Sequence, residues 1–385
     1  MPIIKITDLN LSNKRVLIRS DLNVPIQNKK IISYARINAS LPTIKLALKN
    51  NAKVIVASHL GRPKEGFYDS ELSLFPIFKY FQEIFKKYKV YFCKNYLNGI
   101  ETKSGELTIL ENVRFNKGEK NNNKHLSKTY ANLCDIFVMD AFGSLHRNES
   151  STYGLSKYSK IACSGLLLES ELTALKKIIK KPIRPMITIV GGAKVSTKFN
   201  LLKSLAKISD TLIVGGGIAN TFIAIDNNVG KSLYEPNFIH QAKLLRDNYN
   251  IFIPIDSKVS TTFNENSIGI TKKVSDIDMN EEIMDFGENT ITKMLPILQQ
   301  AKTILWNGPI GVFEFKNFRK GTTALAQTIA NSNAFSVAGG GDTLSVIEIL
   351  NITSKISYIS TGGGSFLKFL EQEEFPIIKL LERFI

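Results

Sequence analysis

The chain has 385 residues, of which 43% are hydrophobic and 22% charged, a length that points to two globular domains. This composition excludes an intrinsically disordered, collagen-like or coiled-coil chain. The longest run without a charge, Thr211–Ile225, is too short to span a membrane, and we expect no cleaved signal peptide. Three widely spaced cysteines without a CxxC pair indicate reduced core thiols. We therefore expect a cytoplasmic protein without a membrane partner.

The formal net charge of +16 raises the question of a nucleic-acid partner. The lysines, however, are spread along the whole chain, and no RNA-binding aromatic motif, zinc-finger spacing or basic heptad is found. We therefore expect no nucleic-acid partner, and the alternative of a basic scaffold or nucleic-acid-binding protein remains to be tested. Six arginines of the first 150 residues point instead to a small anionic ligand: Arg15, Arg19, Arg36, Arg62, Arg114 and Arg147.

Short apolar runs alternate with helical patterns in the first part of the chain. Strands are predicted near Arg15–Arg19, Lys53–Ala57, Thr108–Leu110 and Ile136–Asp140, and helices near Tyr34–Asn50, Leu74–Tyr88 and His125–Leu133. A charged amphipathic helix is predicted over Ser170–Ile179. The closely spaced Pro182 and Pro185 end it and mark a domain boundary.

The second part repeats this alternation. Strands are predicted near Met186–Val190, Thr211–Val214, Ile251–Ile255, Thr303–Trp306, Phe335–Ala338 and Tyr358–Ser360. Each is followed by a glycine-bearing turn and a helix. The pattern predicts the α/β class, with two doubly wound, Rossmann-like parallel sheets. Binding sites of such sheets lie at the carboxyl ends of the strands, where this sequence places its glycines and charged residues.

Two polar motifs follow the first two predicted strands. In RSDLNVP, residues 19–25, Asp21 and Asn23 can lie on one side of an extended segment and bind hydroxyl groups. The alternative is a polar turn that Pro25 ends. In SHLGRP, residues 58–63, His59 and Arg62 lie beside a glycine that lets a ligand approach. Anion binding by His59 is favoured over metal binding, because no second histidine stands at helical spacing.

Two further motifs, LENVRF at residues 110–115 and DAFGSLHR at residues 140–147, also follow strands and supply Arg114 and Arg147. A guanidinium group pairs with phosphate or carboxylate through charge-assisted hydrogen bonds of roughly 1.5–3 kcal/mol each. One such arginine is usually a surface residue. Three in the same topological place, together with Arg36, predict a small polyanionic ligand.

In the second part, GGAKVSTK at residues 191–198 follows a strand and opens a helix, with Lys194 and Lys198 one turn apart. Backbone N–H groups and the helix dipole make this an anion site. It is not a Walker A loop, because the only Gly-Lys-Ser sequence has Ile225 in place of the first glycine. The segment Gly215–Asn220 lacks the GxGxxG spacing, so an NAD-dependent dehydrogenase is poorly supported.

Glycine clusters also follow the late strands, in GGGDT at residues 339–343 and TGGGS at residues 361–365. Asp342 is either a helix N-cap or a magnesium ligand. The segment WNGPIGVFE, residues 306–314, offers an apolar wall and Glu314 for a nucleoside and its ribose hydroxyls, or is simply a strand followed by a proline turn. One half thus suits a small polyanion and the other a nucleotide polyphosphate, which indicates phosphoryl transfer.

These motifs resemble those of phosphoglycerate kinases, in the family's order and over essentially the whole chain. The resemblance implies an N-terminal 3-phosphoglycerate-binding domain (residues 1–169), a hinge helix and linker (170–185) and a nucleotide-binding domain (186–365), with a C-terminal helix (366–385) returning to the first domain. It implies the reaction 1,3-bisphosphoglycerate + ADP ⇌ 3-phosphoglycerate + ATP with Mg²⁺, in glycolysis, by a cytoplasmic monomer with a closing cleft.

The resemblance also implies residue roles. Glycerate binding is implied for Asp21, Leu22, Asn23, Arg36, His59, Leu60, Gly61, Arg62, Arg114 and Arg147. Nucleotide binding is implied for Lys198, Glu314, Gly340, Gly341, Asp342 and Thr343, with Asp342 on the metal. Catalytic roles at the transferring phosphoryl group are implied for Arg36, Lys194, Gly362 and Gly363.

Departures from the family pattern are few. Four residues stand where the family usually has Val, Asp, Ala and Pro: Ser20, Thr197, Leu145 and Leu166, respectively. Thr197 removes a negative charge between two lysines, which we expect to tighten nucleotide binding. None of the four removes a residue with an implied catalytic role.

Overall fold

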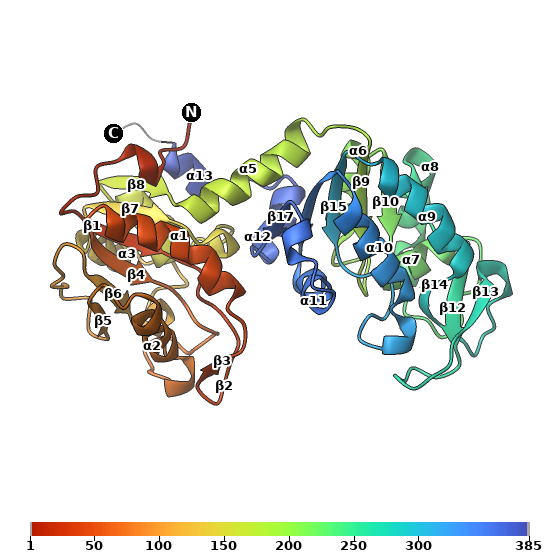
Figure 1. Cartoon of the computed structure of the whole chain (residues 1–385), viewed down its shortest axis with the longest axis horizontal. Helices are drawn as coiled ribbons and strands as arrows, with labels where there is room; N and C mark the ends of the chain where they lie inside the picture. The colour runs from red at the N-terminus through yellow and green to blue at the C-terminus, as the bar shows by residue number, and fades with distance from the viewer. Residues whose placement is uncertain (1, 383–385) are drawn as a thin grey trace. The chain divides into compact units, whose positions relative to one another are not determined.

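The computed structural model describes residues 2–382 (Figure 1). Contacts divide the chain into two compact units, Met1–Thr173 with Glu374–Ile385, and Ala174–Glu373. Within the described residues, each unit contains one six-stranded sheet whose neighbouring strands are all parallel. The predicted α/β class, with two parallel sheets, is confirmed.

The first sheet has the spatial order β5 (Val90–Cys93), β6 (Leu107–Leu110), β4 (Lys53–Ala57), β1 (Arg15–Arg19), β7 (Ile136–Met139) and β8 (Ile161–Ser164). Its helices are α1 (Ala35–Lys49), α2 (Phe75–Ile84), α3 (Lys124–Asn132) and α4 (Leu155–Tyr158). A short hairpin joins β2 (Ile26–Gln27) to β3 (Lys30–Ile31). Strands β5 and β8 were not predicted; both are outer strands of only four residues.

The second sheet has the order β11 (Ile251–Phe252), β10 (Thr211–Val214), β9 (Met186–Val190), β15 (Thr303–Asn307), β16 (Phe335–Gly339) and β17 (Tyr358–Ser360). Its helices are α6 (Phe199–Ile208), α7 (Gly216–Ile223), α8 (Ile239–Asn248), α9 (Glu288–Gln300), α10 (Lys320–Asn331), α11 (Gly341–Ile349) and α12 (Gly364–Leu370). The strand predicted over Ile251–Ile255 ends at Phe252, two residues before Pro254, whose backbone cannot donate to a ladder.

A small antiparallel sheet in the second unit was not predicted. It has the order β13 (Ile270–Lys273), β12 (Asp256–Ser260) and β14 (Glu282–Phe286). Strand β12 reads DSKVS, whose polar residues hide the strand signal, and this sheet interrupts the alternation between β11 and α9. Strand β14 of this sheet packs against α7 and α10.

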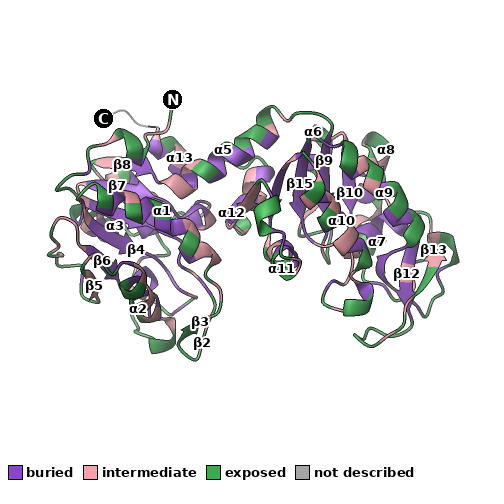
Figure 2. Cartoon of the chain, in the orientation of Figure 1, coloured by how far each residue is buried: buried purple, intermediate pink, exposed green. Residues whose placement is uncertain are grey.

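The central strands are buried on both faces. Val54, Ile55 and Val56 of β4 are each 0% exposed, because helices cover both faces of a doubly wound sheet. β-Branched residues suit these positions because they pack well on a pleated surface. Figure 2 shows the result in each unit: buried strands, and helices that present one exposed face.

Helix α5 (Leu166–Lys180) begins four residues earlier than predicted, and the division between the units falls within it. The returning C-terminal segment is shorter than expected. Helix α12 packs against α6 of the second unit, whereas α13 (Pro376–Leu381) packs against α4 and β8 of the first. The prediction that the whole of 366–385 packs on the first unit is therefore corrected: 366–373 belongs to the second.

Two expectations drawn from the sequence concern membrane-spanning helices and the three cysteines. Across residues 2–382, none of the helices is both long and apolar enough to cross a membrane. All three cysteines are free thiols, as predicted. Cys134 and Cys163 are buried, but Cys93 in β5 is only partly buried and is not a core residue.

Candidate active site

The polar motifs gather at the carboxyl ends of central strands in each unit. In the first sheet, β1 lies between β4 and β7, so the segments that follow these three strands leave the same edge. In the second sheet, β9 likewise lies between β10 and β15. The strand order reverses at β1 and at β9, and crevices at such points are where open α/β sheets bind ligands.

Asp21, Asn23 and Arg36 form one hydrogen-bonded group in the first unit. Arg36 Nη1 donates to the Asn23 carbonyl at 2.8 Å and lies 3.6 Å from Asp21 Oδ1. The Asn23 side-chain oxygen accepts from the Gly61 N–H at 2.9 Å, which joins the loop after β1 to the loop after β4. The Arg36 side chain stays 32% exposed, so part of its guanidinium group remains open to a ligand.

His59 lies between two guanidinium groups. Its Nδ1 is 3.1 Å from Arg19 Nη2 and its Nε2 is 3.2 Å from Arg147 Nη1. Burial, reinforced by the charge of Arg19, holds the pKa of His59 well below its usual value, so the ring is neutral. A neutral imidazole has one acceptor nitrogen and an arginine only donates, so one of the two contacts sets donor against donor. An anionic oxygen placed there would accept from both groups.

Arg114 is held by more hydrogen bonds within the protein than the sequence suggested. Its Nη1 donates to the Gly61 carbonyl at 2.7 Å, and its Nη2 donates to Glu149 Oε1 at 2.7 Å in a buried ion pair. Its Nε is buried and has no partner among the described residues. Arg114 therefore fixes the loop after β4 while its buried Nε donor remains unused, which agrees with a ligand role without testing it.

A buried network behind His59 was not predicted. Arg19 is 0% exposed and donates through Nε to Ser151 Oγ at 2.9 Å, and Ser151 Oγ donates to Glu119 at 2.5 Å. Burial raises the pKa of Glu119 to about 7. Burial also lowers the pKa of Arg19, and the nearby carboxylates partly oppose that lowering. Arg19 and Ser151 are 132 residues apart in the chain, so their pairing leaves no local signal in the sequence.

The remaining residues for which glycerate binding was implied differ in their exposure and in their backbone conformation. Arg62 is exposed. Leu22 and Leu60 are buried, so they shape the loops around the site. Gly61 has φ +59°, and a Cβ there would lie 2.5 Å from a Leu72 methyl carbon, so this turn requires glycine.

Lys198 lies at the centre of the second unit's anion site. Its Nζ donates to the Gly191 carbonyl at 2.6 Å and to Asn307 Oδ1 at 2.7 Å. Asn307 Nδ2 in turn donates to the Gly339 carbonyl at 2.7 Å, so β9, β15 and β16 are tied together. Burial lowers the pKa of Lys198 to about 8, against the opposing charge of Asp342.

The loop after β16 presents a helix start. Gly340 has φ +102°, and a Cβ there would lie 2.7 Å from Asn307 Nδ2. Helix α11 begins at Gly341, and the Thr343 hydroxyl holds this start by accepting from the Gly308 N–H at 2.7 Å and donating to the Gly339 carbonyl at 3.0 Å. The exposed first turn, with its free N–H groups and dipole, suits phosphate oxygens.

Asp342 in this first turn is the metal candidate. It is exposed and has no hydrogen bond or ion pair among the described residues. Nowhere in residues 2–382 do three His, Cys, Asp or Glu side chains gather as a metal cage. A single open carboxylate is what Mg²⁺ needs when phosphate oxygens and water complete its coordination, so the donor set fits this ion.

The loop after β9 carries Lys194 in an exposed position. The neighbouring Ser196 donates through N and Oγ to Glu235 at 2.7 and 2.6 Å, and the Thr197 hydroxyl donates to the Lys194 carbonyl at 2.9 Å. The loop is thus anchored on both sides of Val195 while the Lys194 ammonium group remains exposed. Thr197, a departure from the family pattern, has a hydrogen-bonding role here.

Gly362 and Gly363 precede α12. Gly363 has φ +51°, which favours glycine. The Gly362 N–H donates to Ser360 Oγ at 3.2 Å. The Gly362 N–H is therefore occupied in this structure, and its predicted contact with a phosphoryl group requires that bond to be exchanged.

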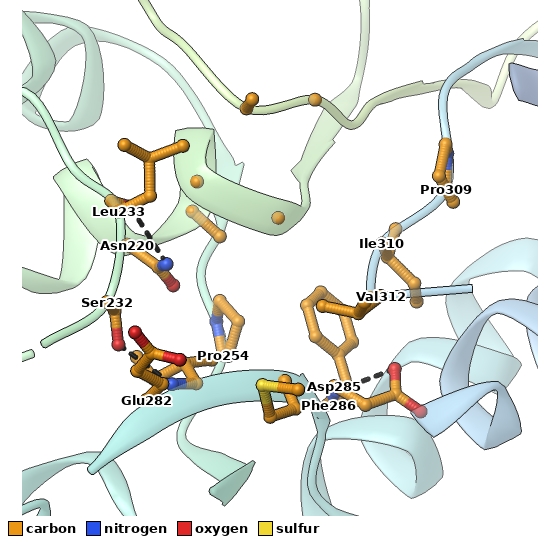
Figure 3. A pocket seen from close by; sticks show the side chains of 18 of the residues that line it. Asn220, Ser232, Leu233, Pro254, Glu282, Asp285, Phe286, Pro309, Ile310 and Val312 are labelled. Carbon is orange, nitrogen blue, oxygen red and sulfur yellow. Dashed lines mark hydrogen bonds between the residues drawn. The ribbon is translucent and has the colours of Figure 1, made fainter. Parts of the chain in front are cut away.

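A cavity of about 720 Å³ opens beside these loops, within the second unit (Figure 3). Apolar and glycine residues from the loop after β9, from α7 and from residues 309–312 form much of its wall, and both Asp342 and Glu314 line it. Its far side comes from Ser232, Leu233, Pro254 and β14, none of which was assigned a role in the site from the sequence. The volume suits a nucleoside.

The segment WNGPIGVFE lines the cavity through residues 309–312 and Glu314, but its first residue, Trp306, does not. Trp306 is 0% exposed, and its Nε1 donates to the Gly308 carbonyl at 2.9 Å inside the core. Being part of β15, Trp306 packs into the core cluster of the unit. The wall is made instead by Pro309, Ile310 and Val312, which follow the strand.

A kinase of small metabolites needs an anion site and a nucleotide site, and the candidates here are an arginine-rich group on one α/β unit and a lysine beside a base-sized cavity on the other. The sequence profile of the family described as phosphoglycerate kinase matches residues 6–373. The chain belongs to the phosphoglycerate kinase family.

Individual relatives support this family assignment. The phosphoglycerate kinase of Buchnera aphidicola subsp. Baizongia pistaciae is 68% identical over 383 residues, covering 100% of this chain and 98% of that one. The phosphoglycerate kinase of Blochmanniella floridana is 58% identical, covering 99% and 96%. The solved structure from Coxiella burnetii is similar with a TM-score of 0.94 at 45% identity, covering 99% of both chains. That from Pyrococcus horikoshii OT3 has a TM-score of 0.83 at 31% identity, covering 99% and 98%.

The predicted family and reaction are thereby confirmed. The chain is a phosphotransferase with a carboxyl group as acceptor. It catalyses the reversible transfer of a phosphoryl group from 1,3-bisphosphoglycerate to ADP, a step of glycolysis.

Proposed function

We propose that the first unit binds the glycerate substrate around His59. The observation that carries this proposal is the neutral imidazole between Arg19 and Arg147, where one contact opposes two donors. A phosphate or carboxylate oxygen relieves that opposition, and Arg36, Arg62 and the unused Arg114 donor supply further charge. Asp21 and Asn23 bind the glycerate hydroxyl, an assignment supported by their contacts with Arg36 and the Gly61 N–H.

We propose that the second unit binds the nucleotide, with the base in the cavity and the phosphates at the starts of α6 and α11. Lys198 and the backbone of residues 340–343 hold the phosphates, and Glu314 binds the ribose. Asp342 would hold Mg²⁺, which would supply positive charge to neutralise the phosphates. Only Asp342 of the candidate residues presents an exposed carboxylate beside that helix start, which supports this assignment.

The transfer we propose is direct and in line, without a covalent enzyme intermediate. The bond from phosphorus to the acyl oxygen breaks as the bond to the β-phosphate oxygen of ADP forms, and no proton has to move. Arg36 and Lys194 stabilise the transferring group electrostatically, with backbone N–H groups near Gly363. Closure of the two units, with α5 and the linker to Pro185 as hinge, brings the substrates together and excludes water. We propose a cytoplasmic monomer.

Arg62→Ala is expected to raise the KM for 3-phosphoglycerate by about tenfold or more and to change kcat little. The reason is that Arg62 is exposed and would contribute charge-assisted hydrogen bonds to substrate and transition state alike. Steady-state kinetics with varied 3-phosphoglycerate measure both constants. An unchanged KM would remove Arg62 from the site.

Lys198 gives the nucleotide affinity a pH dependence. Since its pKa in the free protein is about 8 and only the protonated amine attracts phosphate, the Kd for MgADP is expected to rise as pH increases through 8 to 9.5. Lys198→Arg, which keeps its charge over that range, is expected to flatten the profile. Calorimetric titrations at several pH values test this, and a flat wild-type profile contradicts it.

A coupled assay tests the proposed function as a whole. The protein is given 3-phosphoglycerate and ATP, and the 1,3-bisphosphoglycerate formed is consumed by excess glyceraldehyde-3-phosphate dehydrogenase with NADH. NADH oxidation is expected to require the protein and Mg²⁺, and Asp342→Asn is expected to raise the Mg²⁺ concentration required. A rate independent of Mg²⁺, or an Asp342→Asn variant with an unaltered requirement, would contradict the assigned metal role.

A further inference from the structure

The far side of the nucleotide cavity holds an amide with an unused acceptor. Asn220 of α7 is 4% exposed and lines the cavity. Its Nδ2 donates to the Leu233 carbonyl at 3.0 Å. Because a carbonyl only accepts, this bond fixes which end of the amide is nitrogen. The Oδ1 atom is buried and has no hydrogen-bond partner among the described residues.

A carboxylate lies on the same side of the cavity. Glu282, the first residue of β14, lines the cavity, and its Oε2 is likewise buried without a partner in the part of the chain that the structure describes. The strand is held there by the Ile283 N–H, which donates to Ser232 Oγ at 2.8 Å. Figure 3 shows Asn220, Ser232 and Glu282 together, with Pro309 on the opposite side of the cavity.

Asn220 Oδ1 and Glu282 Oε2 are both acceptors, so a ligand should meet them with donors. A buried acceptor left without a donor costs about 1–3 kcal/mol, so ligands that supply donors are preferred. Guanine presents the N1–H and N2–H₂ groups side by side, an edge that suits a carboxylate. Adenine presents only N6–H₂ beside N1, which is itself an acceptor and would face the carboxylate unfavourably.

We propose that Glu282 and Asn220 read the donor edge of guanine, so that the chain uses GDP at least as well as ADP. The inference rests on the proposed placement of the base in this cavity. Glu282 accepts from the guanine edge and Asn220 Oδ1 accepts a further base N–H group. A site built around unpaired acceptors discriminates against a base that leaves them unpaired.

The test compares GDP, IDP and ADP. IDP keeps N1–H and lacks the N2 amino group, so the wild type is expected to prefer GDP to IDP. In Glu282→Gln, which is isosteric, kcat/KM for GDP is expected to fall about tenfold or more, ADP is expected to change less than about twofold, and the preference for GDP over IDP should largely disappear. Calorimetric Kd values for the three diphosphates provide a second readout.

Glu281→Gln is the matched control. Glu281 pairs with Lys272 at 2.9 Å and accepts from the Asp278 N–H at 2.9 Å, and it does not line the cavity. The same charge is removed one residue away, so the ratio of GDP to ADP should stay at the wild-type value. Thermal melts confirm that both variants fold.

Val312→Trp separates this inference from the proposed placement of the base, on which it rests. Val312 lines the cavity, so the larger side chain takes up space inside it. If the base lies in the cavity, this variant weakens GDP and ADP alike. If it does so and Glu282→Gln leaves the ratio of GDP to ADP unchanged, the role of Glu282 is overturned and the placement stands. If Val312→Trp weakens neither nucleotide, the placement of the base fails as well.

Discussion

Lys194→Met is expected to lower kcat by about 100-fold or more while the Kd for MgADP changes less than about threefold. Lys194 is exposed on the loop after β9, whose backbone is held by Glu235 and the Thr197 hydroxyl. Methionine keeps the length of the side chain and removes its charge. Loss of one charged group aimed at a transferring phosphoryl group typically costs this much or more. Steady-state kinetics and calorimetric titration measure the two effects.

The matched control is Lys203→Met on α6, an exposed lysine outside the loop. It removes the same charge and is expected to keep kcat within about twofold of the wild type. Near-normal turnover of Lys194→Met would exclude Lys194 from transition-state stabilisation. A large rise in the Kd for MgADP would show instead that Lys194 acts in nucleotide binding.

Arg36→Ala is expected to lower kcat/KM for 3-phosphoglycerate by about 1000-fold, the largest effect of any substitution considered. Arg36 is half-buried at the start of α1, and its orientation is fixed by the Asn23 carbonyl and Asp21. The same guanidinium group is proposed to bind substrate and to stabilise the transferring phosphoryl group, and arginines in that second role contribute about 10³-fold or more. The coupled assay measures the loss.

Arg36→Lys provides the comparison that separates charge from geometry. Lysine keeps the charge and loses the planar fork, so activity between that of Arg36→Ala and the wild type is expected. Thermal melts exclude a folding defect, because Asp21 loses its ion-pair partner in Arg36→Ala. A loss of less than tenfold in Arg36→Ala would contradict the proposed double role.

Most strands of the two parallel sheets could be predicted because their apolar runs are continuous. Strand β4, KVIVA, is followed at once by the motif SHLGRP, so both the strand and its functional end are visible in the sequence. Strands β5 and β8 are short and lie outside the central strands, and β12 is polar. The antiparallel sheet depends on pairing between strands, which periodicity within each segment does not reveal.

Candidate anion-binding residues could be proposed from the sequence because most of them follow a strand in a compact motif. The base cavity could not, because α7, Ser232, Pro254 and β14 come from separate segments without a shared motif. The segment WNGPIGVFE was expected to form an apolar wall, and its residues after β15 do so, whereas Trp306 within β15 faces the core. Ser151, which accepts from Arg19 across 132 residues, and Glu119, which accepts from Ser151, leave no trace in local sequence.

Crossed calorimetric titrations of Arg62→Ala and Asp342→Ala test the central claim that each unit binds its own substrate. Arg62→Ala is expected to weaken 3-phosphoglycerate about tenfold or more and to leave the Kd for MgADP unchanged. Asp342→Ala is expected to weaken MgADP and to leave the Kd for 3-phosphoglycerate unchanged. If either variant weakens both ligands when each is titrated alone, or if Asp342→Ala weakens only 3-phosphoglycerate, the account of two separate binding sites is contradicted.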